Sequence, residues 1–365
     1  MRTPDVMVVG GGPAGLSAAL AAAEFGAKVL VADRNDRLGG QLIKQTHKFF
    51  GSKDQYAGTR GIEIAQILAN KVCSLPQVEM MLEAEVLGYY SDGVVTLDQR
   101  DKWVKVKPKA LVVATGASEK FLAFPNNDLP GIYGAGAVQT LMNVYGVLPG
   151  KRVLMVGAGN IGLIVSYQLR QAGVEVAAIV EAMPEIGGYA VHASKVRRMG
   201  IPILCSHGVK EAHGKEVLEG VTVWRLDENW QGIPGTEIDF EVDVLCLAVG
   251  LSPSVELLWQ AGCRMAYVPE LGGHLPWFDE DQQTSVRGIF VAGDAGGVEE
   301  ASSAIMTGRL AGLSAAGYLG CGDEAALEAE RQQVKRELVL LRAGPTGEKI
   351  RRGLAKLRAG GVVPC

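Results

Sequence analysis

The sequence predicts an α/β protein built from two nested three-layer domains, followed by a helical C-terminal tail. Three observations support this class. A strand, glycine turn, helix, strand pattern opens the chain, the same pattern returns at 153–181, and a further strand pattern without its own glycine turn follows at 287–297. Short apolar runs that alternate with helix-favouring segments are typical of parallel sheets covered by helices.

The first pattern begins with the apolar run 6–9, which is too short for a helix and leads directly into GGGPAG at 10–15. A helix is expected at 16–25 and a second strand at 27–32, which ends on Asp33. In such a unit the first glycine permits a tight turn, the second lets the backbone approach a pyrophosphate, and the third lets the helix pack on the strand. The helix N-terminus favours phosphates and the acid binds ribose hydroxyls.

A Rossmann-like dinucleotide site is therefore predicted at the first turn. Its residues would be Gly10, Gly12, Gly15 and Asp33. The alternative is a glycine-rich turn that binds no ligand.

The second pattern repeats these features at VLMVGAGNIG and ends its second strand on Glu181. Because a carboxylate at this place repels a 2′-phosphate, the pattern favours an NAD-type nucleotide over an NADP-type one. The alternatives are another nucleotide, such as ATP, or an empty site. The second turn supplies Gly157, Gly159 and Gly162.

Two further features lie near this second unit. The basic residues Lys195, Arg197 and Arg198 are close enough in sequence to reach a phosphate, but a solvated basic helix face is the favoured interpretation. Gly187 and Gly188 are expected to form a turn beside the nucleotide, or a loop without contact to it.

The order of the closing strands predicts nesting. The similar runs 110–118 and 244–253 each close one unit, and the strand at 287–297 with the small-residue helix 299–316 returns to the first. The predicted first domain is 1–118 with 252–322, the inserted domain is 119–251, and the tail is 323–365.

Composition excludes several classes. The net charge of -4 and the absence of a long basic run argue against nucleic acid as a partner. The apolar run after Arg2 is interrupted by glycines and proline, so neither a signal peptide nor a transmembrane helix is expected. No pair of cysteines has metal-ligand or iron–sulfur spacing, so we expect no metal site and unpaired thiols in a cytoplasmic protein. The cysteines are Cys73, Cys205, Cys246, Cys263, Cys321 and Cys365.

Together with GGQL at 39–42, ATG at 114–116 and GD at 293–294, the two turns resemble the FAD-dependent pyridine nucleotide-disulfide oxidoreductase superfamily, in its thioredoxin-reductase-like two-domain form. This resemblance implies FAD at the first turn and NAD(H) in the inserted domain. The FAD contacts that it implies are Gly10, Gly12, Pro13, Ala14, Gly15, Asp33, Arg34, Gly40, Gln41, Thr46, Val86, Thr115, Gly116, Gly293, Asp294 and Ala301. The implied contacts of the second nucleotide are Gly157, Gly159, Asn160, Ile161, Gly162 and Glu181.

The same resemblance implies roles. Asp33 would bind the adenosine ribose, Asp294 would hold the ribityl chain or pyrophosphate, and the helix beginning near Ala301 would direct its positive end at the flavin. Gly40, Gln41 and Thr46 would lie beside the flavin, and Val86 would contact adenine through its backbone.

A narrower resemblance concerns function. The sequence has no cysteine pair beside the flavin motifs, which excludes disulfide reduction. Segments 114–143 and 272–297 are similar to α subunits of hetero-oligomeric amine and amino-acid dehydrogenases, such as sarcosine oxidase, dye-linked proline dehydrogenase, opine oxidase and hydrogen cyanide synthase. This implies an oxidoreductase that passes hydride or electrons between flavin and a nucleotide or a second flavoprotein chain. The alternatives are a homodimeric, stand-alone NADH-dependent flavin reductase and a non-catalytic electron-relay or scaffold subunit.

Candidates for acid–base chemistry are few. His47 is the weak catalytic candidate, beside Lys44 and Lys48 in the same loop. Glu299 and Glu300 are expected to cap the following helix. In the tail, Leu327, Val334, Leu338 and Leu341 share a helical face that would pack on its own domain or on a partner, and a basic helix is expected at 347–360.

Overall fold

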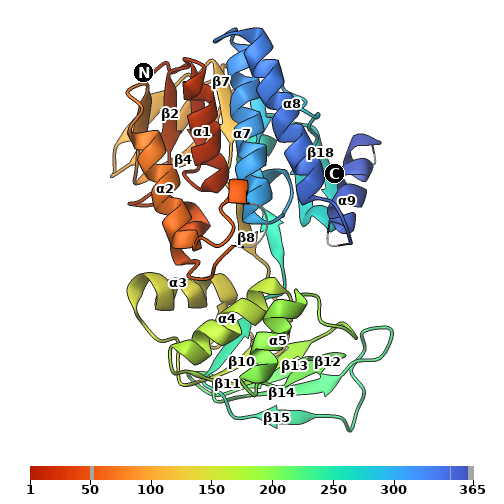
Figure 1. Cartoon of the computed structure of the whole chain (residues 1–365). Coiled ribbons are helices and arrows are strands. Elements are labelled where there is room, and N and C mark those ends of the chain that lie inside the picture. The colour runs from red at the N-terminus through yellow and green to blue at the C-terminus, as the bar shows by residue number, and fades with distance from the viewer. Residues whose placement is uncertain (50–52, 346, 361–365) are drawn as a thin grey trace. The chain divides into compact units, whose positions relative to one another are not determined.

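The computed structural model describes residues 1–49, 53–345 and 347–360, so Cys365 lies outside the described residues (Figure 1). The chain divides into two compact units. Unit 1 comprises Met1–Ser118 and Leu251–Cys365, and unit 2 comprises Glu119–Gly250. The short strands β8 (Ala117–Glu119) and β17 (Leu251–Pro253), where the chain crosses between units, pair with each other.

Unit 1 contains a five-stranded parallel sheet in the order β20-β7-β1-β2-β3. Its strands are β1 (Val6–Val9), β2 (Val29–Ala32), β3 (Val78–Met81), β7 (Ala110–Val113) and β20 (Ile289–Val291). The helices of this unit are α1 (Pro13–Glu24), α2 (Gly61–Cys73), α6 (Glu256–Gln260), α7 (Ala301–Tyr318), α8 (Glu324–Leu341) and α9 (Glu348–Arg358). The remaining strands are β4 (Ala84–Tyr89), β5 (Val95–Gln99), β6 (Trp103–Val106), β18 (Met265–Val268) and β19 (Gly273–Pro276).

Alternation along β1 creates the layers of unit 1. Val6 and Val8 belong to the core formed with α1, α2 and α7, while Met7 and Val9 belong to the core formed with the antiparallel strands β4, β5 and β6. Successive strand side chains point to opposite faces, so a fully apolar strand must be covered on both. The fold class is thus confirmed as layered α/β.

Unit 2 repeats this arrangement. Its parallel sheet has the order β12-β11-β10-β16-β9, with helices packed in one core and the antiparallel sheet β13-β14-β15 in the other. The strands are β9 (Ile132–Gly134), β10 (Arg152–Val156), β11 (Glu175–Glu181), β12 (Ile203–Cys205), β13 (His207–His213), β14 (Gly220–Arg225), β15 (Ile238–Phe240) and β16 (Val244–Leu247). The helices are α3 (Ala135–Tyr145), α4 (Asn160–Gln171) and α5 (Ala190–Arg198).

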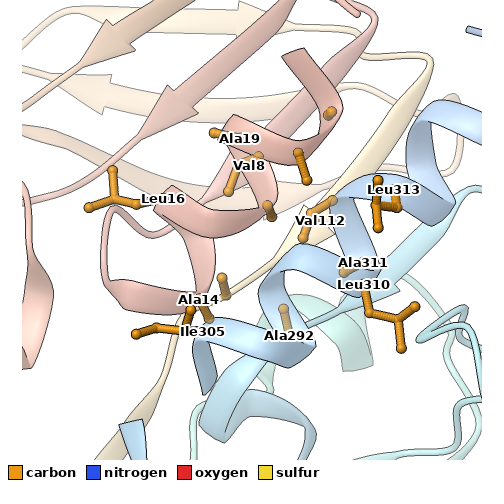
Figure 2. Close-up of a cluster of buried hydrophobic side chains, with 14 of the residues drawn as sticks. Val8, Ala14, Leu16, Ala19, Val112, Ala292, Ile305, Leu310, Ala311 and Leu313 are labelled. Carbon is orange, nitrogen blue, oxygen red and sulfur yellow. The ribbon is translucent and has the colours of Figure 1, made fainter. Parts of the chain in front are cut away.

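Helices α1 and α7 lie side by side, although they are far apart in the sequence (Figure 1). A Cβ on Gly308 would lie 2.1 Å from the Ala14 carbonyl oxygen, and one on Gly312 would lie 2.2 Å from that of Ala18. Figure 2 shows the small and aliphatic side chains that fill this contact, with Ala14 facing Ile305. Small residues four apart therefore let the two backbones meet.

The tail helices pack on unit 1. Leu327, Val334 and Leu338 of α8 are buried in the same core as α1 and α7, and Leu341 packs against it. Leu354 and Leu357 of α9 join the opposite core. The apolar face of the tail thus covers its own unit, whereas Val339 and Leu340 are exposed.

Some expected elements differ in extent. The run 110–118 divides into β7 and β8, because the chain turns at Gly116, whose φ is +75°. Helix α7 begins at Ala301 instead of Glu299 and continues to Tyr318. No described helix has the length and apolarity to cross a bilayer. The five described cysteines are all free thiols, and no metal-binding group occurs among the described residues.

Candidate nucleotide-binding sites

The first glycine turn connects β1 to α1, and two of its glycines are required by the fold. Gly10 has a φ of +106°, and a Cβ there would lie 2.3 Å from the Ala114 carbonyl oxygen. A Cβ on Gly15 would lie 1.7 Å from the Gly10 carbonyl oxygen. These positions accept no side chain because the backbone of the next strand or of the turn itself fills the space.

Gly12 is different. Its φ is -79°, which any residue adopts, and a Cβ there would meet no atom closer than Cα of Gly40 at 3.8 Å. It is also the N-cap of α1, and no side chain caps this helix. The first backbone N–H groups of α1 therefore border open space, as a diphosphate site requires.

Asp33 lies at the end of β2 and is tied to the turn. Its Oδ2 accepts the backbone N–H of Gly11 at 2.6 Å, and its Oδ1 accepts that of Asn35 at 2.7 Å. The neighbouring strand β4 begins here, since Ala84 N–H donates to the Asp33 carbonyl oxygen at 2.9 Å. Val86 is two residues further along β4, and Arg34 is exposed next to Asp33.

The carboxyl ends of adjacent strands bring the other predicted segments to the first turn. A Cβ on Gly40 would lie 2.7 Å from Gly12 Cα, and one on Gly293 would lie 2.7 Å from Ala14 Cβ. Thr115 follows β7 and donates its hydroxyl to the Ser254 carbonyl oxygen at 2.6 Å. The turn thus lies where the strand order reverses between β1 and β7, the usual ligand position in open α/β sheets.

The remaining unit 1 candidates lie around this centre. Gln41 is exposed in the 3₁₀ turn Gly40–Lys44, which Thr46 and His47 follow. The His47 ring stacks on Phe49 with 5.8 Å between centroids. Its role in catalysis stays a prediction.

Asp294 follows β20 and has an unusual environment. Burial raises the pKa of its carboxyl to about 6; the nearby Glu299 carboxylate adds to this effect, while a hydrogen bond from Glu299 N–H opposes it. The segment then enters α7, whose N-cap Glu300 makes no side-chain capping bond. The capping role expected for Glu299 and Glu300 is wrong, because the Glu299 carboxylate instead pairs with Arg342 of the tail at 2.6 and 2.9 Å.

The second turn, between β10 and α4, reproduces the first. Gly157 has a φ of +104° and lies against the Ala248 carbonyl oxygen, and a Cβ on Gly162 would lie 1.9 Å from the Gly157 carbonyl oxygen. Gly159 has a φ of -73°, caps α4 without a side chain, and has nothing within 4 Å of a built Cβ. Glu181 accepts Ala158 N–H at 2.6 Å, as Asp33 accepts Gly11 N–H.

The surroundings of this second turn are also defined. Asn160 accepts the backbone N–H of Tyr189 at 2.8 Å through its side chain, and Ile161 is partly exposed on α4. Gly188 N–H donates to the Ala158 carbonyl oxygen at 2.9 Å, so the loop that contains it lies beside the turn. The Lys195 ammonium lies 3.6 Å from the Tyr167 ring centroid, and Arg197 and Arg198 are exposed.

Two groups of residues at the first site were missed by sequence reasoning. Thr307 accepts Gly293 N–H through its hydroxyl at 3.0 Å, and Gly308 and Gly312 hold α7 against α1. The available signal was the four-residue spacing of the two glycines in the helix. The Arg342 pair with Glu299 had no signal, because 43 residues separate its members.

The residues of the first site fit FAD on two observations. Gly12 is a glycine that the fold itself does not need, and the α1 N-terminus that it opens has no side-chain cap. The same two observations hold for Gly159 and α4.

Comparison with known proteins agrees with this arrangement. The family model described as pyridine nucleotide-disulphide oxidoreductase matches residues 4–308. The first of two opine oxidase chains, from Agrobacterium tumefaciens, is 28% identical over 85% of this chain and 65% of its own length. The alpha chain of sarcosine oxidase from Rhizobium meliloti is 29% identical over 80% of this chain and 28% of its own length. The chain therefore spans less than two thirds of these relatives.

Solved structures agree in fold. L-proline dehydrogenase from P. horikoshii superposes with a TM-score of 0.69 and 24% identity, covering 91% of this chain and 59% of that one. Thioredoxin reductase from T. acidophilum superposes with a TM-score of 0.70 and 23% identity, covering 87% and 99%. With the family model matched across both units, the chain belongs to the pyridine nucleotide-disulphide oxidoreductase family, whose members are FAD-dependent oxidoreductases.

Proposed function

We propose that unit 1 binds FAD, that unit 2 binds NAD(H), and that the protein transfers hydride or electrons between flavin and the nucleotide or a partner chain. The observation that carries this proposal is the pair Gly12 and Gly159. Each has an ordinary φ and open space around a built Cβ, at the uncapped start of a helix. Since the fold needs no glycine there, close approach of a ligand explains both.

When bound, FAD supplies the hydride chemistry, and the protein binds, orients and tunes it. The α1 N-terminus would receive the diphosphate, and Asp33, already oriented by Gly11 N–H, would bind the ribose. The uncapped N-terminus of α7 would offer its positive end to the flavin. These roles follow from the family's arrangement and from the uncapped helix ends.

Unit 2 favours NAD over NADP. Glu181 presents a carboxylate at the end of β11 that would repel a 2′-phosphate. Lys195, the cation that could offset this repulsion, has its ammonium over the Tyr167 ring. The basic helix α5 is thus weakly suited to a phosphate.

The reaction setting that we propose, by similarity to chains of opine oxidase and sarcosine oxidase, is a hetero-oligomeric amino-acid or amine dehydrogenase. In this setting a second chain oxidises the amine, and this chain carries a further flavin and nucleotide site. Purification from the native source would then yield a second flavoprotein chain. Recovery of this chain alone, with full NADH oxidation, would favour a stand-alone reductase.

FAD binding is tested by Gly12→Ala. The added methyl group fits the protein but would occupy the diphosphate approach, so FAD affinity should fall about tenfold to a hundredfold. Stability should stay within about 1 kcal/mol of wild type, because the Gly12 φ of -79° suits alanine. FAD titration of the stripped protein and thermal unfolding measure the two quantities.

The matched control is Gly159→Ala, which places the same methyl group at the same position of unit 2. It should leave FAD affinity unchanged. Equal FAD affinity in Gly12→Ala and wild type, or a colourless wild type that takes up no FAD, would refute the proposal.

A further inference from the structure

The loop 294–300 connects β20 to α7 and carries Asp294, one of the residues that the proposed function assigns to FAD. Internally it is held by few bonds: Gly297 N–H donates to the Asp294 carbonyl oxygen at 3.1 Å, and Glu299 N–H approaches Asp294 Oδ1 at 3.4 Å. Its conformation therefore depends on what contacts it from outside.

The first outside contact comes from the end of α8. Arg342 donates through Nε and Nη2 to the two carboxylate oxygens of Glu299, at 2.9 and 2.6 Å. The side chains are only 14% and 10% exposed. A two-point guanidinium–carboxylate pair fixes orientation as well as distance, so it determines where Glu299 lies.

The second outside contact comes from α9 through Leu271. The Leu271 carbonyl oxygen accepts Val298 N–H at 2.9 Å. Helix α9 packs on this leucine, since a Cβ on Gly353 would lie 2.7 Å from Leu271 Cγ, and Arg352 and Lys356 pair with the adjacent Glu270. The two tail helices thus hold the loop at Glu299 and, through Leu271, at Val298.

The tail helices are also tied to each other. Arg351 of α9 donates to the carbonyl oxygens of Arg342 and Gly344 at the end of α8. All of these tail residues lie beyond the segment 4–308 that the family model matches. The support of the loop is therefore a feature of this chain's own C-terminal part.

We infer that Arg342 is a positioning residue of the FAD site: through Glu299 it holds the loop 294–300, and with it Asp294 and the start of α7, in the arrangement that receives FAD. This inference rests on the proposed function. Without Arg342, the Glu299 carboxylate would be partly buried without its cation and beside the Asp294 carboxyl, so the loop would move outward to hydrate it.

The test is FAD titration of the stripped, full-length protein. Arg342→Ala should weaken FAD binding about tenfold, and Arg342→Lys should restore part of the loss, because lysine keeps the charge without the two-point geometry. The visible spectrum of the remaining bound flavin should shift, since its surroundings change.

Arg331→Ala is the matched control. Arg331 lies on the same helix, is also 14% exposed, and pairs with Glu324 and Glu328 within α8, without contact to the loop. It should lower thermal stability comparably while leaving FAD affinity and spectrum at wild-type values. A merely structural role of Arg342 would make the two variants behave alike.

The path through Glu299 is tested by Glu299→Gln and the double variant. Because both changes break one pair, the double variant should bind FAD no more weakly than Arg342→Ala. If Arg342→Ala does not fold, Glu299→Gln decides, and wild-type affinity in it overturns the inference. Absence of FAD uptake by wild type removes the proposed function as well, whereas uptake with equal affinity in wild type and Arg342→Ala removes this inference alone.

Discussion

Single residues divide the glycines of the two turns into two kinds. Gly10 and Gly15 have no room for a Cβ because backbone atoms lie within about 2 Å of it, so they are required for the chain to fold. Gly12 has room and an ordinary φ, so its requirement comes from outside the chain. The same division holds in unit 2, which makes the open position diagnostic of ligand approach.

Asp294 gives a pH prediction for the FAD-free protein. Its folded pKa of about 6 lies above the ordinary value of 3.8, so folding favours the protonated form. The stabilisation is present below about pH 4 and is lost as the pH rises through about 6. Asp294→Asn should therefore match wild type near pH 4 and exceed it by about 1 to 2 kcal/mol at pH 8, a figure reduced for partial solvent contact.

Urea unfolding of the stripped protein at several pH values measures this difference. The informative quantity is the change in the stability gap between wild type and Asp294→Asn with pH, because other carboxyl groups titrate in both. A gap that stays constant from pH 4 to pH 8 would show that Asp294 has no raised pKa.

Among the elements, α7 combines two contacts. Its glycines allow the close approach to α1, and its uncapped start faces the turn that α1 begins. Helix α8 then packs on α7, and the bond between Arg342 and Glu299 joins the end of α8 to the loop before α7. The tail is thereby a structural part of unit 1.

Packing of α8 is tested with two neighbouring leucines. Leu338 is 4% exposed within the core and Leu340 is 74% exposed. Leu338→Ala should cost about 2 to 4 kcal/mol because it leaves a cavity, whereas Leu340→Ala should change the free energy of unfolding by less than about 0.5 kcal/mol. Denaturant unfolding distinguishes them; equal, small effects would mean that α8 does not pack as described.

For the whole molecule, the main feature is one device used twice. Both units place a glycine turn after the central strand of a five-stranded parallel sheet, and both tie the middle residue of the turn to an acid at 2.6 Å. The acid differs in length, Asp33 in unit 1 and Glu181 in unit 2. Under the proposed function, two sites of one geometry would let electrons enter at one nucleotide and leave at another.

Gly159→Ala tests the nucleotide half of this scheme. With FAD bound, the variant should be reduced by NADH at least about tenfold more slowly than wild type at low NADH, because the methyl group obstructs the diphosphate. Dithionite should reduce both flavins equally. Rapid mixing with NADH, followed at the flavin band, gives the rates; an unchanged rate would place NADH elsewhere.

The sequence by itself determined the two turns, the strands beside them and the layered class, because glycine conformation and two-residue alternation are local properties. It also predicted that Asp33 and Glu181 follow the second strand of each unit. Tertiary structure alone decided the contact of Gly308 with Ala14, the orientation of Asp33 by Gly11 N–H, and the pairing of Glu299 with Arg342. These depend on which distant segments pack together, and a glutamate before a helix reads as a cap until the structure brings a cation to it.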